Sequence, residues 1–385
     1  MCPLVQSAAV IFDSMRTRRV GIPELVSDNT LQAFFRLYEF ERWLREMVYT
    51  ELKTYYGIDW LSEIEKAINR SGRGGITAAR SLKSDKRHPH MNTRENDPLW
   101  YLSFEVLQWI VFDEKLWKRF QPYLTTKKLL RAKFDEISPV RNRVAHCREL
   151  HPEDVPRVER VLRDLDQGFW RFCASYNHCF YLSTYKKGSD ELYKYIASKL
   201  KGGMSAVDIT PLYSFRPSSP LQRRSVPGRG GVYYLVFVPN AFQYMDYAEL
   251  LAFTRRSHKN VLHILLDSSQ RKIIVTLPAV LPADVLASTV DDFHDGCCNA
   301  LQLSPLKRLQ MKEAPKGKNR SSREIEDQNR RFEQFAAEWP HYVLPPSHPF
   351  AFFAWCPPIP QHYLGNFFAT GQCIFSSRPS RREAS

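Results

Sequence analysis

The chain has 385 residues, of which 43% are hydrophobic and 25% are charged, and its formal net charge at pH 7 is +14. This length allows two or three domains with buried cores, and this composition excludes a mainly disordered chain. The positive charge indicates a polyanionic partner such as nucleic acid.

No apolar run approaches the roughly 18 residues needed to span a bilayer. The first basic residues follow the short apolar stretch near the N-terminus, which is the reverse of the order in a secretory signal. Eight cysteines without a CxxC pair indicate reduced thiols. We therefore expect a cytoplasmic protein without membrane attachment.

The first half of the chain has the three-and-four spacing of apolar residues that is typical of amphipathic helices, and predicts a helical bundle over residues 27–184. Each of five predicted helices opens with a small polar cap or a proline. These openings are Asp28 or Asn29, Asp97 with Pro98, Thr125 or Thr126, Ser138 with Pro139, and Pro152. The first helix is expected to end at Gly57 in a left-handed cap, with Asp59 and Trp60 as structural residues behind it.

The second half has a different pattern. Residues 185–231 are rich in Gly, Pro and Ser and predict a linker, and residues 232–305 predict a small α/β domain. Strands are expected at 231–238, 261–267 and 272–278, and helices at 247–257 and 282–301. Residues 1–26 form an N-terminal extension, and the basic, proline-rich residues 306–385 are expected to be partly disordered. The predicted fold class is therefore multidomain, an α-helical bundle followed by a small α/β domain.

One stretch of the predicted bundle, "RNRVAH" over residues 141–146, combines residue types that can cleave RNA without a metal. Such a reaction needs a base, an acid and a cation beside the phosphate. His146 can exchange protons near neutral pH, and Arg141 offers a fork of donors that fits a phosphate. If Ser138 is the helix cap, Arg141 lies in the first helical turn, where free amides attract an anion. Asn142 shares a helix face with His146, whereas Arg141 and His146 are about 140° apart on an ideal helix.

Short matches of this kind also occur by chance, and the alternative is a polar surface turn. A looser arginine-to-histidine spacing is found at Arg171 and His178 as well. The residue types alone do not separate these readings.

The surrounding sequence resembles the HEPN superfamily of all-helical domains over residues 31–181. The shared features are a first helix of the type "YEFERWLREMV" followed by "YGIDW", an aromatic-rich second helix, and "RNRVAH" followed by "REL" and a helix that opens at Pro152. The resemblance implies that residues 27–184 form a HEPN-like bundle. It implies a metal-independent endoribonuclease of the toxin, antiviral or RNA-processing kind, in which Arg141 and His146 are catalytic and Asn142 orients them.

The resemblance further implies a homodimer in which two motifs meet in one cleft, and this would answer the 140° separation. We expect RNA as substrate, cleavage by transesterification at the 2′-hydroxyl, no cofactor or metal, and an antitoxin or regulatory partner at the C-terminal domain. The alternative is a non-catalytic module for RNA or nucleotide binding and dimerisation. A binding module needs the positive charge but has no use for a titrating imidazole beside it.

Further candidates surround this motif in the sequence. Glu41 and Arg45 have the spacing of a helical ion pair, which we interpret as a surface salt bridge, although family members often keep a polar group of the first helix near the cleft. Residues 70–94 hold seven Arg or Lys against one Asp, and form either a phosphate-binding loop or a solvated insertion. The RNA-binding candidates in it are Arg73, Arg80, Lys83, Lys86 and Arg87.

The predicted helix at 282–301 carries a cluster that could bind a metal. Its members are Asp291, His294, Asp295 and Cys298. We favour a solvated helix face, because no second ligand group follows at a suitable spacing. A metal site there would be the third reading of the chain, and would make activity sensitive to chelators. Cys173, His178 and Cys179 are expected to pack in the last bundle helix.

Overall fold

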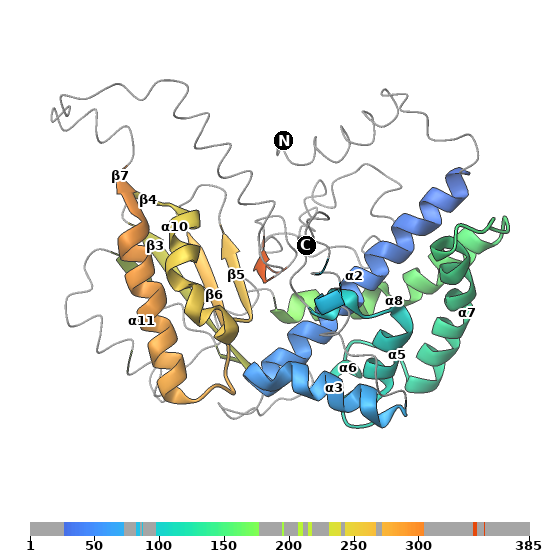
Figure 1. Ribbon diagram of the computed structural model, residues 1–385, viewed down its shortest axis with the longest axis horizontal. Coiled ribbons are helices and arrows are strands. Elements are labelled where there is room, and N and C mark those ends of the chain that lie inside the picture. The colour runs from blue at the N-terminus through green and yellow to red at the C-terminus, as the bar shows by residue number, and fades with distance from the viewer. Residues whose placement is uncertain are drawn as a thin grey trace, which may run out of the picture. The chain divides into compact units, whose positions relative to one another are not determined.

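The computed structural model confirms the predicted fold class: a helical region precedes a mixed sheet with helices beside it (Figure 1). The structure describes residues 27–72, 82–84, 87, 98–176, 195, 207–210, 215–217, 231–239, 243–266, 272–303, 342–344 and 350. The chain divides into two compact units. The described residues of the first unit fall within 27–48 and 114–176, and those of the second within 49–113 and 177–352. The division therefore cuts the helical region itself.

The first unit is entirely helical. Its helices are α2 (Asp28–Tyr56), of which it holds residues 28–48, α6 (Trp117–Phe120), α7 (Lys127–Ala145) and α8 (Asp154–Tyr176). At its core the ring of Phe40 lies edge-on to those of Phe134 and Phe169, with centroids 5.8 and 6.0 Å apart. The amide of Thr30 donates to the Ser27 hydroxyl at 3.3 Å, so the capping residue of α2 lies just before the predicted one.

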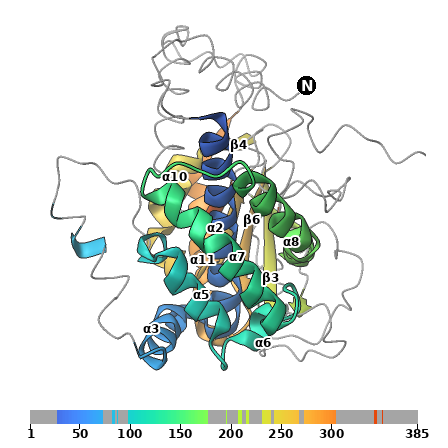
Figure 2. The ribbon, with the colours of Figure 1, turned by 90° about the vertical axis from the view of Figure 1, so that its right-hand side faces the viewer.

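Helices α7 and α8 lie side by side and run antiparallel, joined by a short turn (Figure 2). Lys133 of α7 forms an ion pair with Asp164 of α8, and near the turn Arg143 pairs with Asp154. The backbone of α8 also approaches the chain after α6 closely, since a Cβ placed on Gly168 would lie 1.8 Å from the carbonyl oxygen of Tyr123. Only glycine fits at that position.

The predicted helix start at Ser138 and Pro139 is wrong, because Pro139 lies inside α7. Thr126 caps this helix and accepts from the amide of Leu129 at 3.4 Å. A proline in a helix interior removes one backbone hydrogen bond. Here the buried residues on both sides of it share one face and keep the helix in one piece. These residues are Leu130, Phe134, Ile137 and Val140.

The second unit begins with helical elements. They are residues 49–56 of α2, the 3₁₀ turns η1 (Gly57–Asp59) and η2 (Pro98–Tyr101), α3 (Trp60–Arg70) and α5 (Phe104–Phe112). Gly57 has φ +60° and ends α2 in the predicted left-handed cap. Trp60, interpreted as an end of the first helical region, instead opens α3. Ser103 caps α5 and accepts from the Val106 amide, whereas the predicted cap Asp97 lies outside the described residues.

The sheet of the second unit has the order β1-β3-β6-β5-β8, with β2 also paired to β3. Its strands are β1 (Val207–Thr210), β2 (Phe215–Pro217), β3 (Gly231–Pro239), β5 (His263–Leu266), β6 (Ile273–Pro278) and β8 (Val343–Leu344). All pairs are antiparallel except β5 with β8. The strands β1 and β2 come from the segment interpreted as a linker, and β8 comes from the C-terminal segment for which we predicted no strand.

Two helices and a short ladder complete this unit. They are α10 (Tyr247–Phe253), followed by the 3₁₀ segment η4 (Thr254–Asn260), α11 (Ala283–Ala300), and β4 (Gln243–Met245) paired with β7 (Leu301–Leu303). Apolar side chains of α10 and α11 share one buried core with alternate residues of β3, β5 and β6. Within the described part of the chain, no helix is both long and apolar enough to cross a membrane.

Candidate functional site

The "RNRVAH" motif occupies the C-terminal end of α7 and its cap, His146. The amides of Cys147 and Arg148 donate back to the carbonyls of Val144 and Arg143, at 3.2 and 2.8 Å. Cys147 has a φ of 52°, in the left-handed region where such caps usually carry glycine. These two bonds and the left-handed residue form a Schellman motif, which fixes the direction in which the chain leaves the helix.

This placement overturns the predicted anion site at a helix N-terminus. Arg141 lies in the penultimate turn of α7 instead of the first turn. A helix ends in free carbonyl groups and the negative end of its dipole, which favour cations over phosphate. Any phosphate at this motif must therefore be held by side chains, without help from the helix backbone.

Arg141 lies beside the accessory pair of the first helix. Its Nε donates to Glu41 Oε1 at 2.9 Å, while Nη2 of Arg45 donates to Glu41 Oε2 at 3.1 Å. The side chains of Glu41 and Arg45 are 13% and 10% exposed, so this pair is no surface salt bridge, contrary to our interpretation. Because α2 packs on α7 here, the structure brings Glu41, Arg45 and Arg141 together.

The guanidinium of Arg141 keeps donors available. Its side chain is 27% exposed and uses Nε alone in its contact with Glu41. One carboxylate between two guanidinium groups leaves this cluster with a net positive charge. The Nη groups of Arg141 make no hydrogen bond to another described residue, so they can receive an anion.

Asn142 and His146 take no part in these contacts. Both are exposed, and neither side chain makes a hydrogen bond or ion pair with the described part of the chain. His146 is the capping residue of α7, and its backbone amide donates to the Asn142 carbonyl at 3.1 Å. The imidazole is thus open to solvent on a well-defined piece of backbone.

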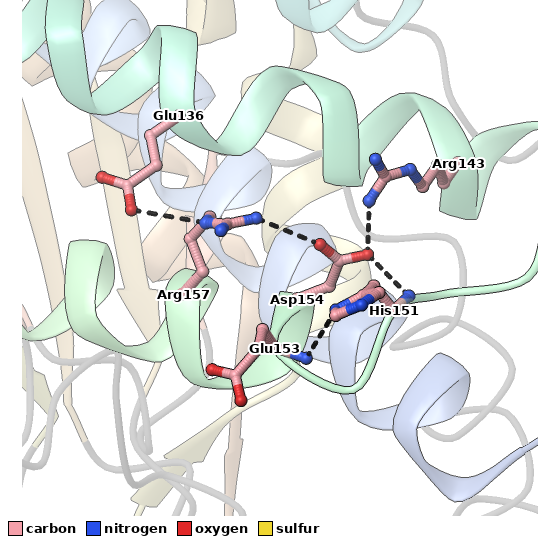
Figure 3. A network of polar contacts seen from close by, with 6 residues as sticks. All are labelled: Glu136, Arg143, His151, Glu153, Asp154 and Arg157. Carbon is pink, nitrogen blue, oxygen red and sulfur yellow. Dashed lines mark hydrogen bonds and ion pairs between the residues drawn. The ribbon is translucent and has the colours of Figure 1, made fainter.

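Asp154, the first residue of α8, lies behind the turn and was not among the residues expected at the site (Figure 3). The side chain of Asp154 has no exposed surface. Its Oδ2 accepts from Nη1 of Arg143 at 2.6 Å and from the His151 amide at 2.9 Å, and its Oδ1 accepts from Nη1 of Arg157 at 3.3 Å. Arg157 also lies 3.6 Å from Glu136. These contacts tie α7, the turn and α8 to one buried group.

The charges around Asp154 outweigh the cost of its burial. Burial raises the pKa of this carboxyl, but hydrogen bonds from Arg143 and from the His151 amide, with the charges of Arg143 and Arg157, leave the pKa below its ordinary value. The Schellman motif holds one end of the turn and Asp154 holds the other. The loop that carries His146 is therefore fixed on both sides.

The structure describes only two of the five basic candidates for RNA binding. Lys83 and Arg87 are exposed, whereas Arg73, Arg80 and Lys86 lie outside the described residues. In α8, Arg171 is exposed and Cys173 is fully buried, as predicted for this cysteine. His178 and Cys179 also lie beyond the described residues.

Polar side chains of the cluster on α11 contact one another and Tyr195. His294 contacts Asp295 through Nδ1 at 3.2 Å and Cys298 through Nε2 at 3.7 Å, and the hydroxyl of Tyr195 donates to Asp291. Burial, and then the charge of Asp295, raise the pKa of the Cys298 thiol, which disfavours the thiolate that a metal needs. Among the residues that the structure describes, no three His, Cys, Asp or Glu are grouped to hold a metal ion.

A buried histidine links two segments of the second unit. Nε2 of His258 lies 3.0 Å from the Thr254 hydroxyl, and Nδ1 lies 2.8 Å from the hydroxyl of Tyr342. Burial, followed by the positive charges of Arg255 and Lys53, lowers the pKa of His258 to about 4. The ring is therefore neutral at pH 7, and it attaches the residues next to β8 to η4.

Comparison of the chain with known proteins found no matching family model, no matching curated protein and no matching solved structure. A functional assignment therefore depends on the geometry of the site itself.

Proposed function

We propose that this protein is a metal-independent endoribonuclease that cleaves RNA by transesterification at the 2′-hydroxyl, with Arg141, Asn142 and His146 at the reacting phosphate. One observation carries the proposal. The solvent-exposed imidazole of His146 lies on a turn that is fixed at both ends, little more than one helical turn after an arginine with free donors. An accessible imidazole and a cation on one rigid element suit acid–base cleavage of a phosphodiester.

In the proposed reaction His146 removes the proton of the 2′-hydroxyl. The 2′ oxygen then bonds to the adjacent phosphorus while the bond from phosphorus to the 5′ oxygen breaks. Arg141 stabilises the negative charge that gathers on the non-bridging oxygens, and Asn142 orients the phosphate. The 5′ oxygen leaves with a proton donated by His146 of a second copy of the chain, which acts as the acid. The products carry a 2′,3′-cyclic phosphate and a 5′-hydroxyl.

The proposal includes a homodimer, because Arg141 and His146 of one copy are five residues apart on one helix. It also places the protein in the cytoplasm, which agrees with free thiols at the four described cysteines. The α/β domain would bind an antitoxin or another regulatory partner, in a toxin, antiviral or RNA-processing context.

A non-catalytic module for RNA or nucleotide binding and dimerisation is the second candidate. It is favoured by the ion pair between Arg141 and Glu41, since a guanidinium already engaged by a carboxylate has lost part of its attraction for phosphate. This candidate predicts RNA binding without cleavage, and it assigns no function to the imidazole of His146.

The two candidates are separated by incubating the protein with a mixed RNA pool in excess EDTA. We compare the wild type with His146→Asn, which suits the capping position, and with Arg148→Ala, which removes a neighbouring exposed charge. The endoribonuclease predicts cyclic phosphate ends from the wild type and from Arg148→Ala, and a rate about 100-fold to 10,000-fold lower for His146→Asn. Equal cleavage by His146→Asn, or binding without any cleavage, would contradict it.

A further inference from the structure

Two aromatic rings lie exposed on α2 in the first unit. Phe34 and Tyr38 are 48% and 49% exposed, and their rings stack at 6.2 Å between centroids with 20° between planes. Phe35 lies edge-on to Phe34, with centroids 5.7 Å apart. Because Phe34 and Tyr38 are four residues apart on a helix, their rings form one continuous apolar strip. This strip, Phe34 with Tyr38, is called the aromatic pair below.

Among the described residues, the other large hydrophobic side chains that are exposed include no second pair of stacked rings. Those are Ile58, Leu129, Phe253 and Val280. A stable protein interface buries about 800 Å² on each partner, far more than two rings provide. Two flat and nearly parallel faces are instead the size of one or two nucleobases, which stack on aromatic side chains in single-strand binding proteins.

One partly exposed cation lies beside the aromatic pair. Arg42 lies one turn after Tyr38, and its side chain is 44% exposed although it pairs with Glu39 at 3.4 Å. Glu41, three residues after Tyr38, is the carboxylate that holds Arg141 of the motif. Tyr38 is therefore within one helical turn of Glu41, and Phe34 within two turns.

The start of α8 approaches the same part of α2. Arg36 forms an ion pair with Glu159 of α8 at 3.3 Å. In both ribbon views the turn between α7 and α8, which carries His146, lies at the same end of this unit as the first turns of α2 (Figures 1 and 2). The first turns of α2 and the turn after the motif are thus at one end of the same unit.

We propose that Phe34 and Tyr38 bind unpaired bases of an RNA strand whose backbone reaches Arg141 and His146. The choice of RNA as ligand rests on the proposed function. An A-form duplex keeps its bases stacked inside and offers the rings no free base face, whereas loops and single strands do. The protein is thus specific for single-stranded RNA, and the aromatic pair supplies that specificity.

The test is a binding titration with labelled 2′-O-methyl RNA, which has no 2′-hydroxyl to react. An unstructured 12-nucleotide strand is compared with the duplex of the same sequence. The key variant is Phe34→Leu with Tyr38→Leu, which keeps the surface apolar but removes the stacking faces. Phe253→Leu, on α10 and 51% exposed, is the matched control, and Phe34→Tyr with Tyr38→Phe should restore wild-type affinity.

We expect the leucine variant to bind the single strand about 10-fold to 100-fold more weakly, with duplex binding unchanged. Wild-type affinity of the leucine variant for the single strand, with its melting temperature also unchanged, would overturn the inference. So would a loss of self-association without a loss of RNA affinity, since the rings would then contact a second copy. Cleavage is measured separately, so wild-type binding without cleavage would contradict the endoribonuclease while leaving the base-binding role intact.

Discussion

Arg143 and Asp154 form a 2.6 Å hydrogen bond between the end of α7 and the start of α8, and the carboxylate of this pair has no exposed surface. The motif was chosen from the sequence for Arg141 and His146. Arg143, which lies between them in the sequence, ties the motif to the start of α8. This difference separates residues that could react from those that hold them in place.

Replacing Asp154 by Ala is expected to destabilise the first unit by about 3 kcal/mol, because it leaves Arg143, Arg157 and the His151 amide without their acceptor. Denaturant unfolding measures this change. Glu153→Ala, on the exposed neighbour, should stay within about 0.5 kcal/mol of wild type. A similar loss in both variants would mean that the network has no special role.

The lowered pKa of Asp154 also gives a pH dependence. The stabilisation from this carboxylate is fully present above the ordinary aspartate pKa of about 4 and is lost as pH falls through the lower pKa of the folded state. Unfolding curves between pH 5 and pH 2 should therefore converge for wild type and Asp154→Ala at the acid end. Parallel curves over this range would contradict the assigned direction.

Glu41→Gln is expected to lower the cleavage rate about 10-fold to 100-fold while leaving RNA affinity equal or higher. The carboxylate positions Arg141, but its charge opposes that of RNA. Single-turnover cleavage and equilibrium binding measure the two effects separately. Glu63→Gln in α3, outside the site, serves as the control with the same loss of charge. A parallel loss of rate and affinity would show that Glu41 acts only through stability.

Acid should weaken the second unit through His258. Its pKa is about 4 in the folded state and 6.5 in a model compound, so the unfolded chain takes up the proton first as pH falls. The contribution of neutral His258 to the free energy of unfolding is fully present above pH 6.5. It decreases by about 3 kcal/mol as the pH falls to 4. Denaturant unfolding of the wild type and of His258→Gln, which does not titrate, measures this difference. The variant's unfolding free energy should change less across that window, and equal slopes would remove His258 as the cause.

A methyl group at position 168 should not be tolerated. The Cβ of Gly168→Ala would lie 1.8 Å from the carbonyl oxygen of Tyr123, so the backbone of α8 must shift. We expect a loss of about 2–3 kcal/mol in the free energy of unfolding, whereas Gln167→Ala on the exposed neighbour should be nearly neutral. A stable Gly168→Ala protein would show that α8 can move away from this contact at little cost.

Much of the fold follows from local pattern. The long apolar spacing of α2, the caps at Thr126 and Gly57, and the β-branched runs of β3 and β6 were readable from the sequence, because each signal lies within one element. The wrong helix start at Pro139 also came from a local signal. Pro139 is a strong local stop signal, but the buried residues on both sides of it hold α7 together, and that packing depends on residues elsewhere in the chain.

The candidate site was only partly readable. Arg141, Asn142 and His146 could be selected by residue type, but the contact of Arg141 with Glu41 joins residues 100 positions apart, and no spacing rule predicts it. Asp154 was missed as a buried anchor because its role depends on the conformation of the turn before α8. The strand β8 was not predicted because it has only two residues, too few to form a strand pattern in the sequence. It is defined by its pairing with β5, which is distant in the sequence.

The left-handed cap of α7 also makes the site chemically addressable. Cys147 follows His146 directly and is exposed, whereas of the other described cysteines Cys173 and Cys297 are buried and Cys298 is partly buried. Once the other cysteines of the chain are replaced by serine, a fluorophore or spin label on this thiol lies next to the candidate catalytic histidine. The unusual residue at the helix end thus provides a reporter position from which RNA arrival at the motif can be followed in real time.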